Sequence, residues 1–151
     1  MKISISGRKV YGGVAEGYAL VTKDALGGMG VFDVYTGIVT EPNNPWEGQC
    51  VTGKVLVYKT GRGSSSWAAW HQQLKFLNTS PVAHVITESN PQTALGAVLS
   101  RIPVVTDFDQ DPTELIQTGD WVRVDGDNGI VEITKKDSNT TLNTESKRRE
   151  T

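Results

Sequence analysis

The part of the sequence that most constrains the fold lies between residues 53 and 105, where strand-like and helix-like stretches alternate. The strand-like stretches are short apolar runs rich in β-branched residues, typical of strands that are covered on both faces. Because parallel strands need a crossover between them, this alternation predicts a parallel sheet in an α/β domain. The predicted strands are residues 54–58, 82–86 and 102–105, and the predicted helices are residues 67–77 and 93–99.

The chain before this region is predicted to be extended and then irregular. Apolar and polar residues alternate over residues 3–5, and short extended pieces follow over residues 10–21, broken by glycines that include Gly17. Residues 26–48 are rich in Gly, Pro and Asn, which predicts a long structured loop with one short strand at residues 37–40. A loop of this length in a small domain usually serves a surface or a site.

The C-terminal part combines a short helix, a hairpin and a polar tail. Asp111 and the proline after it predict the start of the helix. A turn of Asp, Gly and Asn residues then predicts a β-hairpin between residues 121–124 and 130–133. The chain that follows is polar and charged, which is typical of disorder. We therefore expect a single domain over residues 1–134 and a disordered tail over residues 135–151.

Charge, cysteine content and hydropathy narrow the functional classes. The chain has 151 residues and a net charge of −2, which disfavours a nucleic-acid partner because phosphate backbones attract basic surfaces. The single cysteine, Cys50, excludes an internal disulfide and a zinc or iron–sulfur site built from this chain's thiolates alone. No apolar run approaches the roughly 20 residues that span a bilayer, and the N-terminus lacks a signal-peptide block. We expect no membrane partner and a cytoplasmic location.

The segment best suited to chemistry joins the first predicted strand of the alternating region to its first helix. Its glycines permit unusual backbone conformations and let a ligand approach closely. The helix start offers unpaired N–H groups and a positive dipole end, which suit a carboxylate or a phosphate. Serines at this position can cap the helix, bind the anion or transfer a proton. This segment, called the serine turn below, reads Gly61-Arg62-Gly63-Ser64-Ser65-Ser66.

Simpler interpretations of the serine turn stay open at this point. One serine can be a helix cap and the glycines a tight turn, because such turns are common. The segment is not a nucleotide-binding P-loop, since no lysine lies between Gly61 and Ser66. It is not a hydrolase nucleophile elbow either, because the Gly-x-Ser-x-Gly pattern is absent.

The serine turn and several other stretches resemble one known family. Gly61-x-Gly63-Ser64-Ser65 matches the turn of the swivel domain in aconitases and isopropylmalate isomerases. Over residues 7–133 the chain is similar to the stand-alone small subunit of aconitase X. The further stretches that carry this resemblance are Gly7-Arg8-Lys9-Val10, Gly12-Gly13-Val14-Ala15-Glu16-Gly17, Thr36-Gly37, Gly53-Lys54-Val55-Leu56-Val57, Ala94-Leu95-Gly96-Ala97, Ile102-Pro103 and Thr118-Gly119-Asp120-Trp121-Val122-Arg123-Val124-Asp125-Gly126.

The resemblance implies a swivelling β/β/α fold and a hydro-lyase reaction on a small hydroxy acid. It also implies a large partner subunit that carries an iron–sulfur cluster, so that this chain alone binds no cofactor. The substrates known in the family are cis-3-hydroxy-L-proline and mevalonate 5-phosphate, the latter dehydrated to trans-anhydromevalonate 5-phosphate. The sequence slightly favours the hydroxyproline type, because residues 66–78 depart from the pattern associated with phosphomevalonate.

The resemblance also assigns roles within the serine turn. The first serine of the pair removes the proton next to a carboxylate in aconitases, which implies that Ser64 is the base. Ser65 then anchors the substrate or serves as the alternative base. Aconitases have an arginine directly after the pair where this chain has Ser66, so Arg62 or a group of the partner must take over carboxylate binding. Gly61, Gly63 and Ser66 complete the predicted substrate-binding residues, and no metal ligand is predicted.

Two other functions remain as alternatives. The stretch from Thr93 to Gly126 resembles swivelling phosphotransfer domains, which carry a phosphorylated histidine near the start of the helix before Ile102. This chain has Gln92-Thr93 there and no histidine, so we interpret the similarity as a shared fold and not a shared chemistry. The second alternative is a non-catalytic binding module that has kept the fold.

Other polar residues are predicted to be structural. Asp107 and Asp109 belong to a solvated loop that lacks the glycine and glutamate of a calcium site, although either aspartate is a candidate to face the substrate. His71 is predicted to lie at a boundary or an interface, and His84 is predicted to be a structural residue in a strand. Cys50 is predicted to be a small buried hydrophobic residue.

Overall fold

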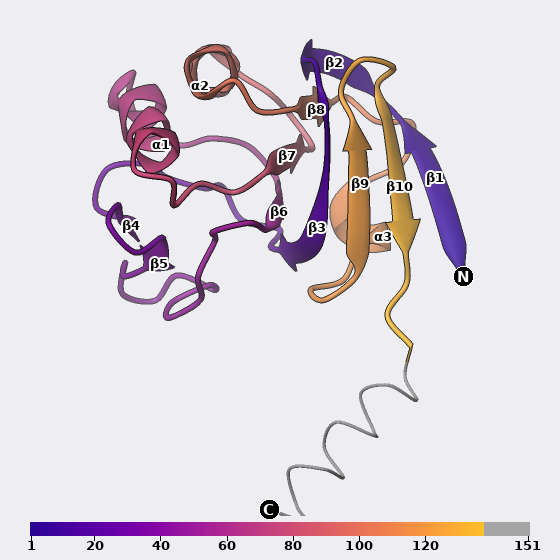
Figure 1. The fold of residues 1–151 in the computed structure, drawn as a ribbon, viewed down its shortest axis with the longest axis horizontal. Helices are drawn as coiled ribbons and strands as arrows, with labels where there is room; N and C mark the ends of the chain where they lie inside the picture. Colours follow the sequence, from indigo (N-terminus) through magenta and orange to yellow (C-terminus); the bar gives the residue numbers. More distant parts are fainter. Residues whose placement is uncertain (138–151) are drawn as a thin grey trace, which may run out of the picture.

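Residues 1–137 are described by a computed structural model, in which a curled sheet carries its two longer helices on its outer face (Figure 1). The eight strands of this sheet lie in the order β1-β10-β9-β3-β6-β7-β8-β2. A separate pair, β4 (Phe32–Asp33) and β5 (Ile38–Val39), lies in the long connection between β3 and β6. The other elements are β1 (Lys2–Ser6), β2 (Arg8–Tyr11), β3 (Val14–Val21), β6 (Val55–Tyr58), α1 (Ser66–Phe76), β7 (Ala83–Ile86), α2 (Pro91–Ser100), β8 (Val104–Thr106), α3 (Pro112–Leu115), β9 (Trp121–Asp125) and β10 (Ile130–Thr134).

The sheet has a parallel centre and antiparallel flanks. Strands β3, β6, β7 and β8 run parallel, as the alternation of elements predicts. Strand β9 pairs antiparallel with β3, and β2 pairs antiparallel with β8 at the other end. Only Gly7 separates β1 from β2, although these strands occupy opposite ends of the strand order. The sheet therefore bends back on itself, and at this bend the Gly7 amide donates to the carbonyl oxygen of Gly129 (2.8 Å).

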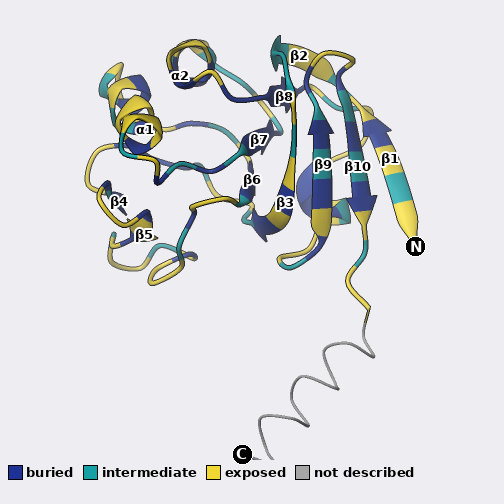
Figure 2. Ribbon diagram, viewed as in Figure 1, coloured by how far each residue is buried: buried dark blue, intermediate teal, exposed yellow. Residues whose placement is uncertain are grey.

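This curvature gives the central strands two apolar surroundings (Figure 2). Val55 and Val57 of β6 belong to the interior enclosed by the sheet, together with apolar residues of β7, β9 and β10. Leu56 and Tyr58 lie on the alternate face and belong to the core under α1 and α2. All four side chains have no exposed surface, which confirms the prediction of a strand covered on both faces.

The α/β class is confirmed, and the two crossover helices and the hairpin occur where they are predicted. One detail differs. Gly17 does not break its strand; a Cβ at this position would lie 2.5 Å from the carbonyl oxygen of Gly53, so the glycine permits a close contact. Helix α1 is followed by a turn in which Asn78 has a φ of 60°. The described part of the chain contains no helix that is long and apolar enough to cross a membrane.

A buried carboxylate fastens the end of the described chain to the sheet. Asp120 has no exposed surface and accepts hydrogen bonds from the Lys135 ammonium (2.5 Å) and from the amides of Gln117 (2.8 Å) and Lys136 (2.9 Å). Burial by itself would raise the pKa of Asp120, but these donors outweigh burial and lower it. The predicted tail thus begins with two residues bound to Asp120, and residues 138–151 lie outside the described residues.

We expect Asp120→Asn to lower the free energy of unfolding at pH 7 by about 1–3 kcal/mol, because the ionised partner of Lys135 is lost. The pKa of Asp120 is lower in the fold than its ordinary value of 3.8. The carboxylate therefore stabilises the fold above pH 3.8 and loses this effect as the pH falls through the folded pKa. Urea denaturation at pH 7 and at low pH measures both effects.

The matched control is Glu114→Gln, which removes the carboxylate of an exposed ion pair with Lys23. Exposed pairs contribute little to stability, so this variant should unfold almost as the wild type does. Equal losses in the two variants, or a loss in Asp120→Asn that does not shrink in acid, would contradict the role given to Asp120.

Candidate functional site

The serine turn connects the carboxyl end of β6 to α1. Gly61 forms an isolated parallel bridge with Leu26, and its carbonyl oxygen accepts a hydrogen bond from the side chain of Asn90 (2.8 Å), the residue that caps α2. The carbonyl oxygen of Gly63 accepts a second bond from Gln92, in the first turn of α2 (3.1 Å). Two side chains at the start of α2 therefore hold the turn in place, next to the carboxyl end of a parallel strand, where α/β proteins commonly bind ligands.

The serine at the N-cap position of α1 does not cap the helix with its side chain. Ser65 occupies the N-cap position, but its side chain makes no capping hydrogen bond. Ser64 is exposed, its Oγ lies 3.0 Å from the Oγ of Ser66, and its carbonyl oxygen accepts a bond from the amide of Trp67 (3.0 Å). The Oγ of Ser64 also accepts a long hydrogen bond from the amide of Ser66 (3.4 Å), so Ser64 makes a local contact with the first residue of the helix. The hydroxyl of Ser65 makes no capping hydrogen bond, and both serines are exposed to a ligand.

The serine turn lines one side of a hollow of about 210 Å³, and the long connection after β3 lines the other. Residues 27–29 of that connection are called the glycine wall below. A Cβ on Gly28 would lie 2.8 Å from the Cα of Trp67, so the wall rests directly on the start of α1. This wall is not predicted from the sequence. The features that could have indicated it are the two neighbouring glycines, Gly27 and Gly28, in a long loop that is expected to serve a site. The hollow is lined by Gly27, Gly28, Met29, Arg62, Gly63, Ser64, Ser66 and Trp67.

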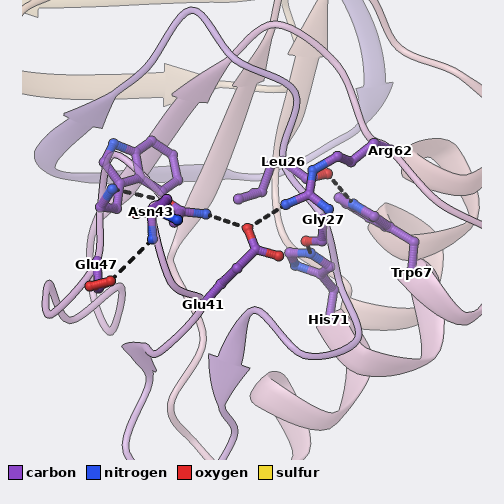
Figure 3. A network of polar contacts seen from close by, with 10 residues as sticks. Leu26, Gly27, Glu41, Asn43, Glu47, Arg62, Trp67 and His71 are labelled. Carbon is purple, nitrogen blue, oxygen red and sulfur yellow. Dashed lines mark hydrogen bonds and ion pairs between the residues drawn. The ribbon is translucent and has the colours of Figure 1, made fainter.

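Arg62 lies between this hollow and a larger pocket, and it is paired with an acid. Its Nη2 atom forms an ion pair with Oε1 of Glu41 (2.5 Å), as Figure 3 shows. The hydrogen bond from Arg62 lowers the pKa of Glu41, so the pair is ionised at neutral pH. The guanidinium also packs on the glycine wall, where a Cβ on Gly27 would lie 2.8 Å from Nη1. Only Nη2 hydrogen-bonds within residues 1–137, so the other side-chain N–H groups of Arg62 can meet a ligand.

The larger pocket has a volume of about 530 Å³ and adjoins the hollow through Arg62, which lines both. Lys23 and Lys59 also line it. The Lys23 ammonium forms an ion pair with Glu114 (2.5 Å), whereas the Lys59 ammonium has no hydrogen-bond or ion-pair partner in the described part of the chain. The pocket therefore places one unpaired cation and one partly available arginine beside the serine turn.

The two aspartates considered as substrate contacts lie elsewhere. Asp107 forms an ion pair with Arg8 (2.7 Å), and Asp109 accepts a hydrogen bond from the Ser6 amide (3.2 Å). Neither aspartate lines the hollow or the larger pocket. Asp111 caps α3, as predicted, by accepting a bond from the amide two residues later (2.9 Å). The structure thus brings the predicted serine turn together with Arg62 but not with these aspartates.

Both histidines are buried. His84 lies with its Nδ1 atom 2.7 Å from the hydroxyl of Tyr58, which confirms its structural assignment. The prediction for His71 is wrong: its residue surface is 3% exposed, and its ring stacks on Trp67 with centroids 3.8 Å apart. The imidazole packs like an apolar ring, so the buried stripe of α1 is wider than the apolar residues alone predict. Burial lowers the pKa of His71 to about 4, and it also lowers that of His84.

Comparison with known proteins agrees with this arrangement. A sequence model of the family described as the aconitase X swivel domain matches residues 4–133. The phosphomevalonate dehydratase small subunit of Methanococcoides burtonii is 40% identical over 131 residues, which cover 87% of this chain and 96% of that protein. The protein of the same name from Thermococcus kodakarensis is 39% identical over 131 residues, with the same two coverages of 87% and 96%. The crystal structure of Thermococcus kodakaraensis aconitase X in its holo form matches with a TM-score of 0.82 and 38% identity, covering 88% of this chain and 99% of that chain.

We expect Gly63→Ala to distort the serine turn and to cost about 1–3 kcal/mol of stability, because a side chain is strained at a positive φ. Gly63 has a φ of 101°, and no atom lies within 4 Å of the added Cβ, so backbone strain is the sole cause. Urea denaturation measures the loss, and the amide chemical shifts of Ser64 and Trp67 report the distortion.

Gly48→Ala is the matched control, since Gly48 has a φ of 83° and equally open surroundings but does not line the hollow. It should lower stability in the same way while leaving the Ser64 and Trp67 shifts unchanged. If neither variant moved those shifts, Gly63 would not be needed for the shape of the turn.

Proposed function

The chain belongs to the aconitase X swivel domain family and is a small subunit of an aconitase X-type dehydratase, and on this premise we propose that its substrate is mevalonate 5-phosphate and its base is Ser64. Its relatives are named as small subunits, so the enzyme includes a large subunit as a separate chain. The observation that carries the proposal is the exposed Ser64 hydroxyl at a hollow that also receives the guanidinium of Arg62.

The choice of a phosphorylated substrate has two supports. Relatives from several organisms carry the name phosphomevalonate dehydratase small subunit, which outweighs the slight preference for cis-3-hydroxy-L-proline drawn from residues 66–78. The pocket that adjoins the serine turn is lined by three cationic side chains, Lys23, Lys59 and Arg62, and by two carboxylates, Asp24 and Glu41. Lysine and arginine are the side chains that bind phosphate groups, and Lys59 has no anionic partner among residues 1–137.

Ser64 is proposed to remove the proton from the carbon next to the substrate carboxylate. The C–H electron pair then forms the carbon–carbon double bond as the hydroxyl group leaves with the electron pair of its C–O bond. The departing hydroxide takes up one proton to form water and Ser64 gives up the proton that it accepted, so the net change is the loss of one water molecule. A serine hydroxyl is a weak base, so its deprotonated form needs strong stabilisation. The Ser66 amide, which donates to the Ser64 Oγ atom (3.4 Å), the Ser66 hydroxyl at 3.0 Å, the guanidinium of Arg62 and the positive end of the α1 dipole are the groups of this chain that can supply it.

The residues of this chain do not fit the iron–sulfur cluster that the resemblance implies. Cys50 is the sole cysteine of the sequence; it is half-buried, and its thiol donates to the carbonyl oxygen of Thr36 (3.5 Å). Residues 1–137 contain no group of three or more His, Cys, Asp or Glu side chains that could hold a metal. We therefore assign the cluster to the large subunit and derive no step of the reaction through it.

The proposal is tested by anaerobic reconstitution of the full chain with the large subunit of the same organism. Mevalonate 5-phosphate and cis-3-hydroxy-L-proline are offered separately, with unphosphorylated mevalonate as the control for phosphate recognition. We expect turnover of mevalonate 5-phosphate alone. Turnover of the hydroxyproline would assign the other substrate, and an intact complex that turns over neither would favour a non-catalytic binding module.

In that complex we expect Ser64→Ala to lower kcat by about 1000-fold or more, because the proton acceptor is lost. The KM should change little, and gel filtration should show unchanged complex formation, since the hydroxyl contributes no contact to the core. Ser4→Ala, which alters an exposed serine of β1 outside the hollow, should retain full activity. Full activity of Ser64→Ala would remove Ser64 from the mechanism.

A further inference from the structure

Two ring nitrogens of α1 hold two consecutive carbonyl groups at the base of the glycine wall (Figure 3). The indole N–H of Trp67 donates to the carbonyl oxygen of Leu26 (2.9 Å). One helical turn later, Nε2 of His71 lies 3.2 Å from the carbonyl oxygen of Gly27. The two rings are stacked with an interplanar angle of 24°, so each ring restrains the other. These contacts join segments that are 41 and 44 residues apart in the sequence.

The glycine wall has little room to move relative to the serine turn. The Leu26 carbonyl oxygen also accepts a hydrogen bond from the amide of Arg62 (2.9 Å), and the Leu26 amide donates to the carbonyl oxygen of Thr60 (2.8 Å). Gly27 packs against the Arg62 guanidinium and Gly28 against the backbone of Trp67. A displacement of the Gly27 carbonyl group would therefore move residues on both sides of the hollow.

The protonation state of His71 suits a fixed donor and not a proton carrier. A carbonyl oxygen only accepts hydrogen bonds, so Nε2 carries the hydrogen and Nδ1 does not. Nδ1 is buried and has no hydrogen-bond partner among the described residues. Burial lowers the pKa of His71 to about 4, so the ring is neutral at pH 7. The ring is also enclosed by Trp67 and by Phe32, whose centroid lies 5.2 Å away, which keeps it from a substrate.

From this geometry we infer that His71 is a positioning residue of the dehydratase, which sets the distance between the glycine wall and Ser64 and thereby orients the substrate in the hollow. The inference rests on the proposed function, because the hollow is taken to be the substrate site. It assigns His71 no contact with the substrate. The effect of its loss is therefore expected in the rate of the bound complex more than in substrate affinity.

Two variants separate positioning from bulk. His71→Leu keeps an apolar side chain in the core but leaves the Gly27 carbonyl group without its donor, whereas His71→Gln keeps an N–H group that can reach this oxygen. In the reconstituted complex we expect His71→Leu to lower kcat about 10- to 100-fold with a small change in KM, because small displacements at a reacting centre are costly. In His71→Gln, kcat should stay within about 3-fold of the wild-type value, because the glutamine N–H group replaces the lost donor to the Gly27 carbonyl oxygen.

Thr79→Val is the matched control for lost stability. Thr79 is also buried, follows α1, and donates from its hydroxyl to a carbonyl oxygen of the same long connection, that of Val34 (2.6 Å), away from the hollow. Thr79→Val should destabilise the chain comparably to His71→Leu and leave kcat unchanged. Any of three results would overturn the inference. The first is an unchanged kcat in His71→Leu, the second is an equal loss of kcat in His71→Leu and His71→Gln, and the third is a loss of kcat in Thr79→Val that matches the loss in His71→Leu.

A second readout works without any turnover. The measured amide is that of Leu26, which donates to the carbonyl oxygen of Thr60. Its hydrogen exchange should be about tenfold faster in His71→Leu than in His71→Gln, because the equilibrium constant for local opening of this segment rises by about the same factor. If the wild-type complex turned over neither candidate substrate, the proposed function would fail. Leu26 exchange that is unchanged in His71→Leu would then still overturn the inference that His71 holds the glycine wall in place.

Discussion

The burial of β6 on both faces is the constraint on which the site depends. The curled sheet covers Val55 and Val57, and the helices cover Leu56 and Tyr58, so the strand cannot shift without exposing apolar surface or breaking two cores at once. The serine turn begins three residues after this strand ends, between the strand and α1. The serine turn, which is rich in Gly and Ser, therefore follows a strand whose position is fixed. Rigid elements position reactive groups more accurately than loops do, and here the loop is fastened at both ends.

The hollow is assembled from two segments that meet only in the tertiary structure. The serine turn supplies hydroxyl groups and the start of a helix, and the glycine wall supplies the facing backbone. Glycines at positions 27 and 28 matter because a Cβ at either would meet Arg62 or Trp67 at 2.8 Å. The stacked rings of Trp67 and His71 then supply hydrogen bonds to the carbonyl groups of Leu26 and Gly27. The arrangement uses buried aromatic rings for their N–H groups as much as for their apolar surface.

The chemistry available to this chain is that of oxygen and nitrogen donors. Ser64, Ser65 and Arg62 are at or beside the hollow, while Cys50 lies with its thiol on Thr36. Such groups can bind anions and move a proton, which is half of what a dehydration requires. The proposed function leaves the other half, the departure of the hydroxyl group, to the large subunit.

The sequence by itself determined the elements whose causes are local. The apolar runs placed β6, β7 and the helices, Asp111 placed the cap of α3, and the glycine and serine pattern marked the serine turn. It did not predict the glycine wall, the pairing of Arg62 with Glu41, or the burial of His71. It also predicted a strand break at Gly17, where the strand continues. Each of these is decided by a contact across a large separation in the chain, such as the 44 residues between His71 and Gly27. Periodicity and turn chemistry report only on near neighbours, whereas these contacts exist only once the sheet has curled and the long connection has packed against α1.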